Sequence, residues 1–409
     1  MRGALAIGLL CLSTAGCPEP STCRSSNFID VPDVVMSVVL SDYASSAIVL
    51  VREDGTNVVW VDSGSRAPEL VSALSGDVVL PSTSLTSDAL VLLDRYQSDV
   101  MTVLPFESPN SLLWQADLRG GRTAGTSPNP QDAVALPDGR WLVSRFNPSI
   151  ASVAEMARGN DLVLIDPRAR AMVMRIDLHA DVQVEGTHFY ARPTRLAPLA
   201  AEGRDYVLAG LARLSDLSLR ASGPGAVALV DASRFTTSVL ALPGLSNCGA
   251  VAAIPGHASE AFVLCRGDAF AVDESRSGIV HVAIEEGVLV ERARFAPATH
   301  TAMPAPGNGL VPIDDAHVAY VAHGALSPPS PDRLVMLTQG AEFDILAEAE
   351  AFTLGEGAYD ARSARLLVPD GEMRSVRTFE SAGDVWREGD ALAMPLCVHL
   401  PPRQVAVVE

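Results

Sequence analysis

The side chains that could bind or activate a ligand in this sequence are arginines, histidines and one tyrosine near the ends of short apolar segments. The candidates are Arg145, His179, His188, Tyr190, Arg192, Arg213, His300 and His323. An arginine can hold a carboxylate or a phosphate through two parallel hydrogen bonds, so these residue types indicate a site for a small anionic ligand. A second explanation stays open, in which the histidines are solvated and Arg145 pairs with a local acid such as Asp161 or Glu185.

No complete catalytic or metal-binding motif occurs in the sequence. The nucleophile elbow Gly-x-Ser-x-Gly, the zinc helix His-Glu-x-x-His, the phosphate-binding loop, Cys-x-x-Cys-His and the EF-hand loop are all missing. Adjacent carboxylates occur at Asp273-Glu274, Glu285-Glu286 and Asp314-Asp315, and all three pairs lie at expected turns. We therefore assign no catalytic residue, no metal ligand and no cofactor from the sequence.

Four cysteines are expected to form two disulfides. Cys11 lies within an N-terminal secretory signal and Cys17, directly after it, is expected to carry lipid, which leaves an even number: Cys23, Cys248, Cys265 and Cys397. A hairpin centred between Gly256 and His257 would set Cys248 opposite Cys265, and Cys23 and Cys397 would join the two ends of the chain. A metal site is the alternative, but no Cys-x-x-Cys and no histidine at ligand spacing accompanies these cysteines.

Short strands must position these side chains. From Pro130 to Leu178 the chain has four apolar runs of strand length, separated by Asp-Gly, by an irregular insert and by Asp-Pro-Arg-Ala. The pattern predicts a four-stranded antiparallel meander. Its third run, residues 162–165, is apolar at every position, so neighbouring sheets should cover both faces of that strand.

The same pattern returns along the chain. An aromatic or aliphatic residue followed by Val marks the second strand of each unit, at Ile48, Leu90, Leu142, Tyr206, Phe262, Tyr320 and Leu367. These seven copies lie 42 to 64 residues apart, against roughly 40 to 50 for propeller blades. We expect an all-β fold of seven four-stranded blades over residues 31–409, with blades near 34–74, 77–119, 131–179, 193–243, 248–295, 310–352 and 353–400. The tail, residues 404–409, could add a closing strand to the first or last blade.

Two of these units resemble the YVTN-type β-propeller repeat family. The matching residues are 130–145 with 162–166, and 193–209 with 227–231. The resemblance covers about residues 31–409 and implies a closed seven-bladed ring. Related propellers include lactonase- and lyase-like enzymes whose sites, at the mouth of the central channel, use histidine, arginine and carboxylates, often with a divalent cation.

The N-terminus resembles a bacterial lipoprotein signal. A single charge at Arg2, an apolar run over residues 4–12 and Ser-Thr-Ala-Gly before Cys17 make a leader too short to span a bilayer permanently. The resemblance implies a signal peptide over residues 1–16, lipid on Cys17 and a tether over residues 17–30. An ordinary cleaved signal peptide is the alternative. Either signal exports the chain, and the lipoprotein type places it in the cell envelope, at the outer membrane.

Charge limits the partners. The net charge of −19 repels nucleic acid and anionic lipid surfaces, so nucleic-acid binding is excluded and membrane contact is expected through the anchor alone. The expected partner is an unknown protein, an envelope component or a small anionic ligand, and the chain is expected to be a monomer.

The long loops indicate where recognition would occur. In a four-stranded blade, the loop after the second strand and the link to the next blade open on the same face of the ring. The longest inserts are of these two kinds: residues 120–130, 147–160, 180–192, 211–225, 296–309 and 324–332. Because loops on a rigid scaffold usually carry binding groups, we expect a binding or protein-interaction module that uses this long-loop face. The alternative is a lactonase- or lyase-like enzyme with its site at the channel mouth.

Overall fold

The computed structural model describes most of the chain after the expected tether. The described residues are 34–64, 74–86, 88–95, 98–106, 112–122, 126–149, 154–215, 219, 221–268, 272–300, 302–338, 342–383, 385–395 and 397–408. The expected signal peptide and tether, with Cys17 and Cys23, lie outside them.

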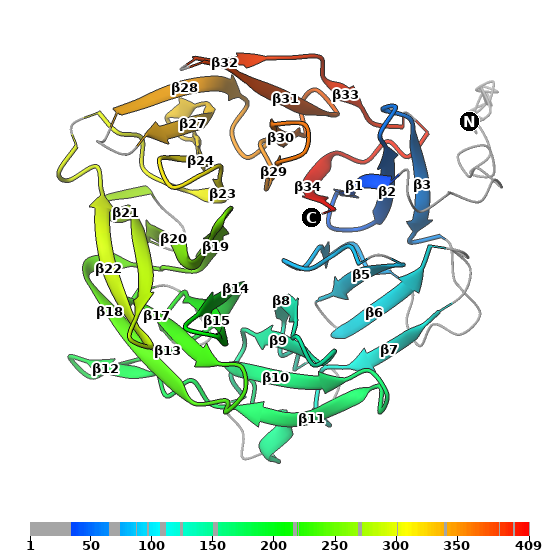
Figure 1. The fold of residues 1–409 in the computed structure, drawn as a ribbon. Coiled ribbons are helices and arrows are strands. Elements are labelled where there is room, and N and C mark those ends of the chain that lie inside the picture. The colour runs from blue at the N-terminus through cyan, green and yellow to red at the C-terminus, as the bar shows by residue number, and fades with distance from the viewer. Residues whose placement is uncertain are drawn as a thin grey trace, which may run out of the picture.

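Antiparallel sheets stand side by side around a ring (Figure 1). The first has the order β3 (Asn57–Asp62), β2 (Ser46–Arg52), β1 (Val34–Ser41) and β34 (Pro402–Val407). The second consists of β4 (Val78–Val79), β5 (Ala89–Asp94), β6 (Val100–Pro105) and β7 (Trp114–Asp117). The third consists of β8 (Pro130–Ala135), β9 (Trp141–Arg145), β10 (Asp161–Asp166) and β11 (Ala171–Ile176).

Four more sheets complete the ring. The fourth consists of β14 (Pro193–Ala201), β15 (Arg204–Leu211), β17 (Pro224–Asp231) and β18 (Thr237–Ser246). The fifth consists of β19 (Ala250–Ile254), β20 (His257–Gly267), β21 (Val272–Glu285) and β22 (Val288–Phe295). The sixth consists of β23 (Asn308–Pro312), β24 (His317–Ala322), β27 (Asp332–Thr338) and β28 (Glu342–Ala349). The seventh consists of β29 (Ala358–Asp360), β30 (Arg365–Asp370), β31 (Ser375–Ala382), β32 (Val385–Glu388) and β33 (Leu392–Ala393).

The long loops contain the remaining elements. They are a three-stranded sheet of β12 (Val182–Val184), β13 (Thr187–Tyr190) and β16 (Leu214–Ser215), a pair formed by β25 (Ala325–Leu326) and β26 (Pro329–Ser330), and the 3₁₀ helix η3 (Glu155–Ala157). Within the described residues, no helix is long and apolar enough to cross a membrane.

The hydrophobic core lies between neighbouring sheets. One cluster joins Leu142 of the third sheet to Val207 of the fourth, and another joins Val49 of the first to Leu367 of the seventh. Every residue of β10 from Asp161 to Ile165 is buried, as the uniformly apolar run predicts. The all-β prediction and the four-stranded antiparallel sheets are thereby confirmed.

The first unit differs from its prediction. Its innermost strand is β34, which pairs with β1, so Ile48 lies in the third strand from the axis and not in the second. In the other six units the aligned residue does lie in the second strand. The first unit differs because β34, from the far end of the chain, completes its sheet, which confirms the expected closing strand and places it in the first sheet.

One predicted disulfide is present. Cys248 and Cys265 are bonded, with Cα atoms 3.8 Å apart. The hairpin register differs from the expectation, because Ala250 pairs with Leu264 and a bulge follows at Ala253–Ile254. Cys397 is in a disulfide, but Cys23 lies outside the described residues, so the pairing of these two stays a prediction.

Candidate functional site

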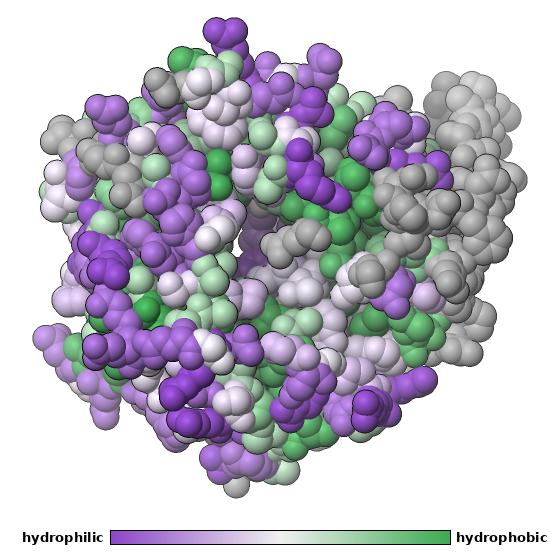
Figure 2. Space-filling model, in the orientation of Figure 1, coloured by the Kyte–Doolittle hydropathy of each residue, from purple (hydrophilic) through white to green (hydrophobic). Residues whose placement is uncertain are grey.

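A cavity of about 500 Å³ lies on the axis of the ring. Every sheet or the segment leading into it contributes to the lining, for example through Gln404, Val78, Gln131, Arg195, Ala250, Asn308 and Glu356. These residues lie where the innermost strands begin, so the cavity opens at one end of the channel. Figure 2 shows the ring hollowed at its centre.

The second strands end at the same face, because they run antiparallel to the innermost strands. Their ends add Arg95, Arg266 and His323 to the lining. The loops that follow second strands and the links between sheets open on this face too, so the cavity mouth and the long loops share one side of the ring.

Two cavity arginines are paired with carboxylates. Arg95 donates two hydrogen bonds to Asp77 Oδ1, at 3.0 and 2.5 Å, and one to Gln131 at 2.9 Å. Arg195 forms an ion pair with Glu356 and lies 3.9 Å from the carboxylate of Asp132. Burial lowers the pKa of Arg195 and Asp132 opposes the shift. These pairs leave little free charge on this side of the cavity.

Asp132 holds three sheets together beneath the cavity. It is fully buried and accepts hydrogen bonds from Ser82 N–H and O–H and from Leu196 N–H, at 2.5 to 2.7 Å. Burial raises its pKa, and Arg195 and these donors counter the shift. Its donors come from the second and fourth sheets, so we assign Asp132 a structural role.

Arg266 differs from the paired arginines. In the described part of the chain its guanidinium makes no hydrogen bond and no ion pair, although the residue is half-buried in the lining. Burial lowers its pKa, and the charge of Asp268 opposes this shift. A half-buried, unpaired cation in a cavity is available to bind negative charge.

His323 and Asp332 lie side by side in the cavity wall. Nδ1 of His323 lies 3.6 Å from Asp332 Oδ1, longer than a hydrogen bond, and has no closer partner among the described residues. Gly307 leaves room for the imidazole, because a Cβ atom at that position would lie 2.6 Å from His323 Cδ2. The ring therefore stands in the cavity wall with its Nδ1 edge toward a carboxylate.

Asp332 is held in its charged form. Its side chain is fully buried and accepts N–H groups of Gly324, Thr353 and Leu354 at 2.7, 2.9 and 3.1 Å. Burial favours the neutral acid, but contact with His323 and these N–H donors outweighs it and lowers the pKa. A carboxylate beside one imidazole nitrogen orients the ring and stabilises its protonated form, as in a general base.

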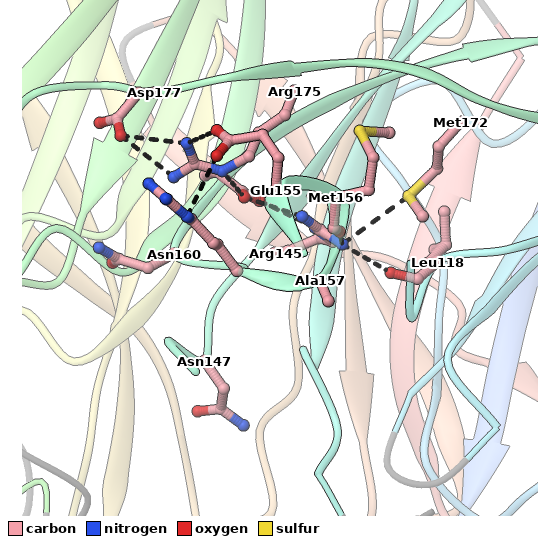
Figure 3. A network of polar contacts seen from close by, with 12 residues as sticks. Leu118, Arg145, Asn147, Glu155, Met156, Ala157, Asn160, Met172, Arg175 and Asp177 are labelled. Atoms are coloured by element: carbon pink, nitrogen blue, oxygen red, sulfur yellow. Dashed lines mark hydrogen bonds and ion pairs between the residues drawn. The ribbon is translucent and has the colours of Figure 1, made fainter. Parts of the chain in front are cut away.

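Arg145 lies in a buried network and not at the cavity. Its side chain is 0% exposed and donates two hydrogen bonds of 2.8 Å to Asp161. Its third nitrogen, Nη1, donates to the carbonyls of Leu118 and Met156 (Figure 3). Because Met156 lies in η3, this contact holds the helix in place. The alternative stated for this arginine, a pair with Asp161, is the arrangement found, so it cannot reach a ligand at the surface.

Arg192 is buried beside the cavity wall. It donates to Asn147 Oδ1 at 3.1 Å, and its guanidinium lies 5.0 Å from the centroid of the Phe146 ring and 5.7 Å from that of Tyr190. Phe146 lines the cavity, so Arg192 packs against a residue of the cavity wall without lining the cavity itself.

Arg213 is also buried. It donates to the carbonyls of Ala180 and Pro224 at 3.0 and 3.2 Å, and burial lowers its pKa. Its contacts join two long loops, which makes it a structural residue.

The predicted histidines are spread over the surface, with one exception. His179 is 80% exposed, His188 lies 3.4 Å from Asp181 and against the ring of Tyr190, and His300 contacts Thr299 at 2.8 Å. Within the described lining, His323 is the one predicted residue. The structure therefore does not bring the eight predicted residues into one site.

Several lining residues were missed by the sequence reasoning. They are Arg95, Arg195, Arg266 and Glu356. A usable signal exists for Arg95 and Arg266, because each follows the aligned second-strand pair by three or four positions. Among the described residues no group of three or more His, Cys, Asp or Glu side chains is arranged to hold a metal ion.

Comparison with known proteins supports the fold. No family model and no curated protein matches the sequence. A candidate 6-phosphogluconolactonase from Bacteroides fragilis has a TM-score of 0.56 at 11% identity, covering 92% of this chain and 98% of its own. A second candidate 6-phosphogluconolactonase, from Bacteroides uniformis, has a TM-score of 0.56 at 9% identity, covering 92% of this chain and 99% of its own. A periplasmic gluconolactonase from Pseudomonas aeruginosa has a TM-score of 0.55 at 11% identity, covering 92% of this chain and 99% of its own. At these identities the likeness shows a β-propeller-like fold alone.

Proposed function

We propose that this chain is an exported lactonase-like enzyme that opens a small lactone ring in the channel mouth. The observation that carries the proposal is that Arg266, which has no ion pair among the described residues, lines the same cavity as His323, whose imidazole faces the buried Asp332 carboxylate. The solved lactonase-type structures share the fold and so agree with an enzyme of this class. These features favour the enzyme over the binding module that the loops suggest.

The reaction follows from the two side chains. His323 would take a proton from water while the water oxygen bonds to the lactone carbonyl carbon, and Asp332 would stabilise the imidazolium that forms. Arg266 would stabilise the negative charge that develops on the carbonyl oxygen. The ring C–O bond then breaks, the imidazolium returns its proton to the departing alkoxide, and a hydroxy acid leaves.

Hydrolysis of simple lactones tests this function. The purified protein should raise acid release, followed in a pH-stat, above the spontaneous rate for D-glucono-δ-lactone or δ-valerolactone. We expect H323Q to lower kcat/KM roughly 10²- to 10⁴-fold and R266Q about 10²- to 10³-fold. The matched control is R140Q, which alters an arginine paired with Asp138 at an exposed turn.

A rate equal to the spontaneous one for every lactone would overturn the proposal. Ligand binding in the cavity without turnover would instead favour the binding-module function.

The wider assignments are part of the same proposal. We propose that the sheets are seven blades of a YVTN-type propeller, that Cys17 carries lipid, and that the monomer resides in the cell envelope. The repeat spacing, the closing strand β34 and the leader sequence support these points.

A further inference from the structure

Two exposed aromatic residues contact an arginine at the rim of the cavity, one through its ring and the other through its backbone carbonyl. Tyr43 is 68% exposed and Phe352 is 50% exposed, and both line the cavity. Arg403 lies between them, with its guanidinium 5.5 Å from the centroid of the Tyr43 ring and a hydrogen bond of 3.2 Å to the carbonyl of Phe352. The Phe352 ring in turn lies 5.5 Å from the ring of His323. The row Tyr43, Arg403 and Phe352, here called the rim subsite, therefore leads into the proposed reaction site.

The charge of Arg403 is not neutralised by a contacting acid. Its hydrogen bonds go to the carbonyls of Ser41 and Phe352, and in the described part of the chain it has no ion pair. Asp42 is close enough to feel its charge, but that carboxylate already accepts N–H groups of Ala44 and Ser45. A guanidinium bound only to carbonyls, in a protein of net charge −19, is suited to an external anion.

The backbone holds the two rings in place. Tyr43 and Phe352 adopt left-handed angles, φ 67° and 65°, which are unfavourable for bulky side chains. Gly76 packs so closely that a Cβ atom there would lie 2.4 Å from the carbonyl of Tyr43. The loops thus hold large aromatic side chains exposed at the mouth, against both local preference and the hydrophobic effect.

We propose that the rim subsite binds a sugar acid. A pyranose ring has a C–H face that can stack on Tyr43 or Phe352, while its carboxylate pairs with Arg403. An acid without hydroxyl groups or a neutral sugar would satisfy only half of these contacts. The inference rests on the proposed function for the position of the reacting bond, and it names the substrate class of that site.

Three small probes separate the two contacts. They are methyl β-D-glucuronide, which has the ring and the carboxylate, methyl β-D-glucoside, which lacks the carboxylate, and cyclohexanecarboxylate, which lacks the sugar hydroxyls. By saturation-transfer NMR and calorimetry, the glucuronide should bind at least tenfold more tightly than either other probe. Equal affinity for all three probes would refute the subsite.

Variants assign the contacts to residues. At least one of Y43A and F352A should weaken glucuronide binding about tenfold, and alanine is no more strained than the aromatic residue at these angles. Unchanged binding in both variants would refute stacking on these rings. R403Q should reduce glucuronide binding to the level of the glucoside and leave glucoside binding unchanged. The matched control is the Arg140–Phe235 pair, a guanidinium 5.2 Å from a ring centroid at turns on the other face, so R140Q and F235A should change nothing.

The outcomes distinguish this proposal from the proposed function. If R403Q fails to fold, R403K keeps the charge, and Y43A and F352A still test the rings. A loss of all three probes to the same degree in R403Q would mark a structural role and overturn the inference. Lactone hydrolysis without preferential binding of the glucuronide would sustain the proposed function and refute the rim subsite. Preferential binding of the glucuronide without lactone hydrolysis would sustain the rim subsite and refute the proposed function.

Discussion

Arg145, Arg266 and His323 lie at or just after the end of the second strand of their sheets, and the residue opposite each one decides its role. Arg145 pairs in register with Asp161, which neutralises it. Arg266 lies opposite Ser277, which has no charge to neutralise the guanidinium. His323 comes one position after Ala322, whose partner is Arg333, so Asp332 stands at its side. The ends of second strands thus carry a structural arginine, an arginine without an ion pair among the described residues, and a candidate base.

The sequence predicted these positions better than their roles. The end of a second strand is readable from the apolar pattern, and that pattern selected Arg145 and His323. The partner in the third strand depends on loop length and register, which differ from sheet to sheet. For this reason the sequence could state the Arg145–Asp161 pair only as an alternative, and Arg266 was missed.

At this scale we predict that Arg145 is needed for stability. Replacing it with alanine leaves the fully buried Asp161 with Arg175 as its one ion-pair partner among the described residues, which should lower the free energy of unfolding by about 3 to 5 kcal/mol. Urea denaturation followed by circular dichroism measures the loss. R140A, which breaks an exposed pair, should change stability by about 0 to 1 kcal/mol. A similar small loss in both variants would show that the network contributes little.

The strands themselves were largely predictable because their apolar runs are short and bounded by turn residues. Pairings between distant segments were not. β34 completes the first sheet across more than 300 residues of chain, and the bulge after Ala253 shifts the hairpin at Cys248 by one position. The pattern of residues 404–409 indicates a strand but not which sheet it joins, because ring closure decides that. The bulge has no signature in a local window, because packing of the hairpin sets it.

Gln404 gives a prediction about ring closure. It is buried in β34, and its amide accepts the N–H of Leu80 and donates to the carbonyl of Leu80, both at 2.8 Å. The side chain thereby joins the closing strand to the second sheet as a backbone partner would. We expect Q404L to lower the free energy of unfolding by about 1 to 3 kcal/mol, because the N–H of Leu80 loses its partner while its carbonyl keeps the hydrogen bond from Arg195 at 3.2 Å.

The comparison variant for Q404L is Q183L, at an exposed glutamine in β12. Unfolding of Q183L in urea should match that of the wild type. If the free energy of unfolding of Q404L also matched that of the wild type, the contact with Leu80 would be dispensable for closing the ring.

At the scale of the molecule, the cavity could not be read from any one segment. Each sheet contributes one or a few side chains, and only closure of the ring brings them together. What the sequence did indicate is the face on which they meet, because the long loops and the cavity mouth share it. The ring therefore has one face with the cavity mouth and the long loops, and an opposite face of shorter turns.

The position of β1 predicts how an anchored molecule would present these two sides. β1 begins at Val34 and ends at Ser41, which lines the cavity, so the chain enters the ring on the face opposite the mouth. With lipid on Cys17, the short tether holds that opposite face toward the membrane and leaves the mouth open to solvent.

Fluorophores on cysteines introduced at Asp54, on the opposite face, and at Leu326, 75% exposed on the mouth side, should report this orientation in liposomes. A quencher carried by lipid headgroups should quench the label at Asp54 more strongly than that at Leu326, and C17A should abolish both effects. Stronger quenching at Leu326 would mean that the mouth faces the membrane.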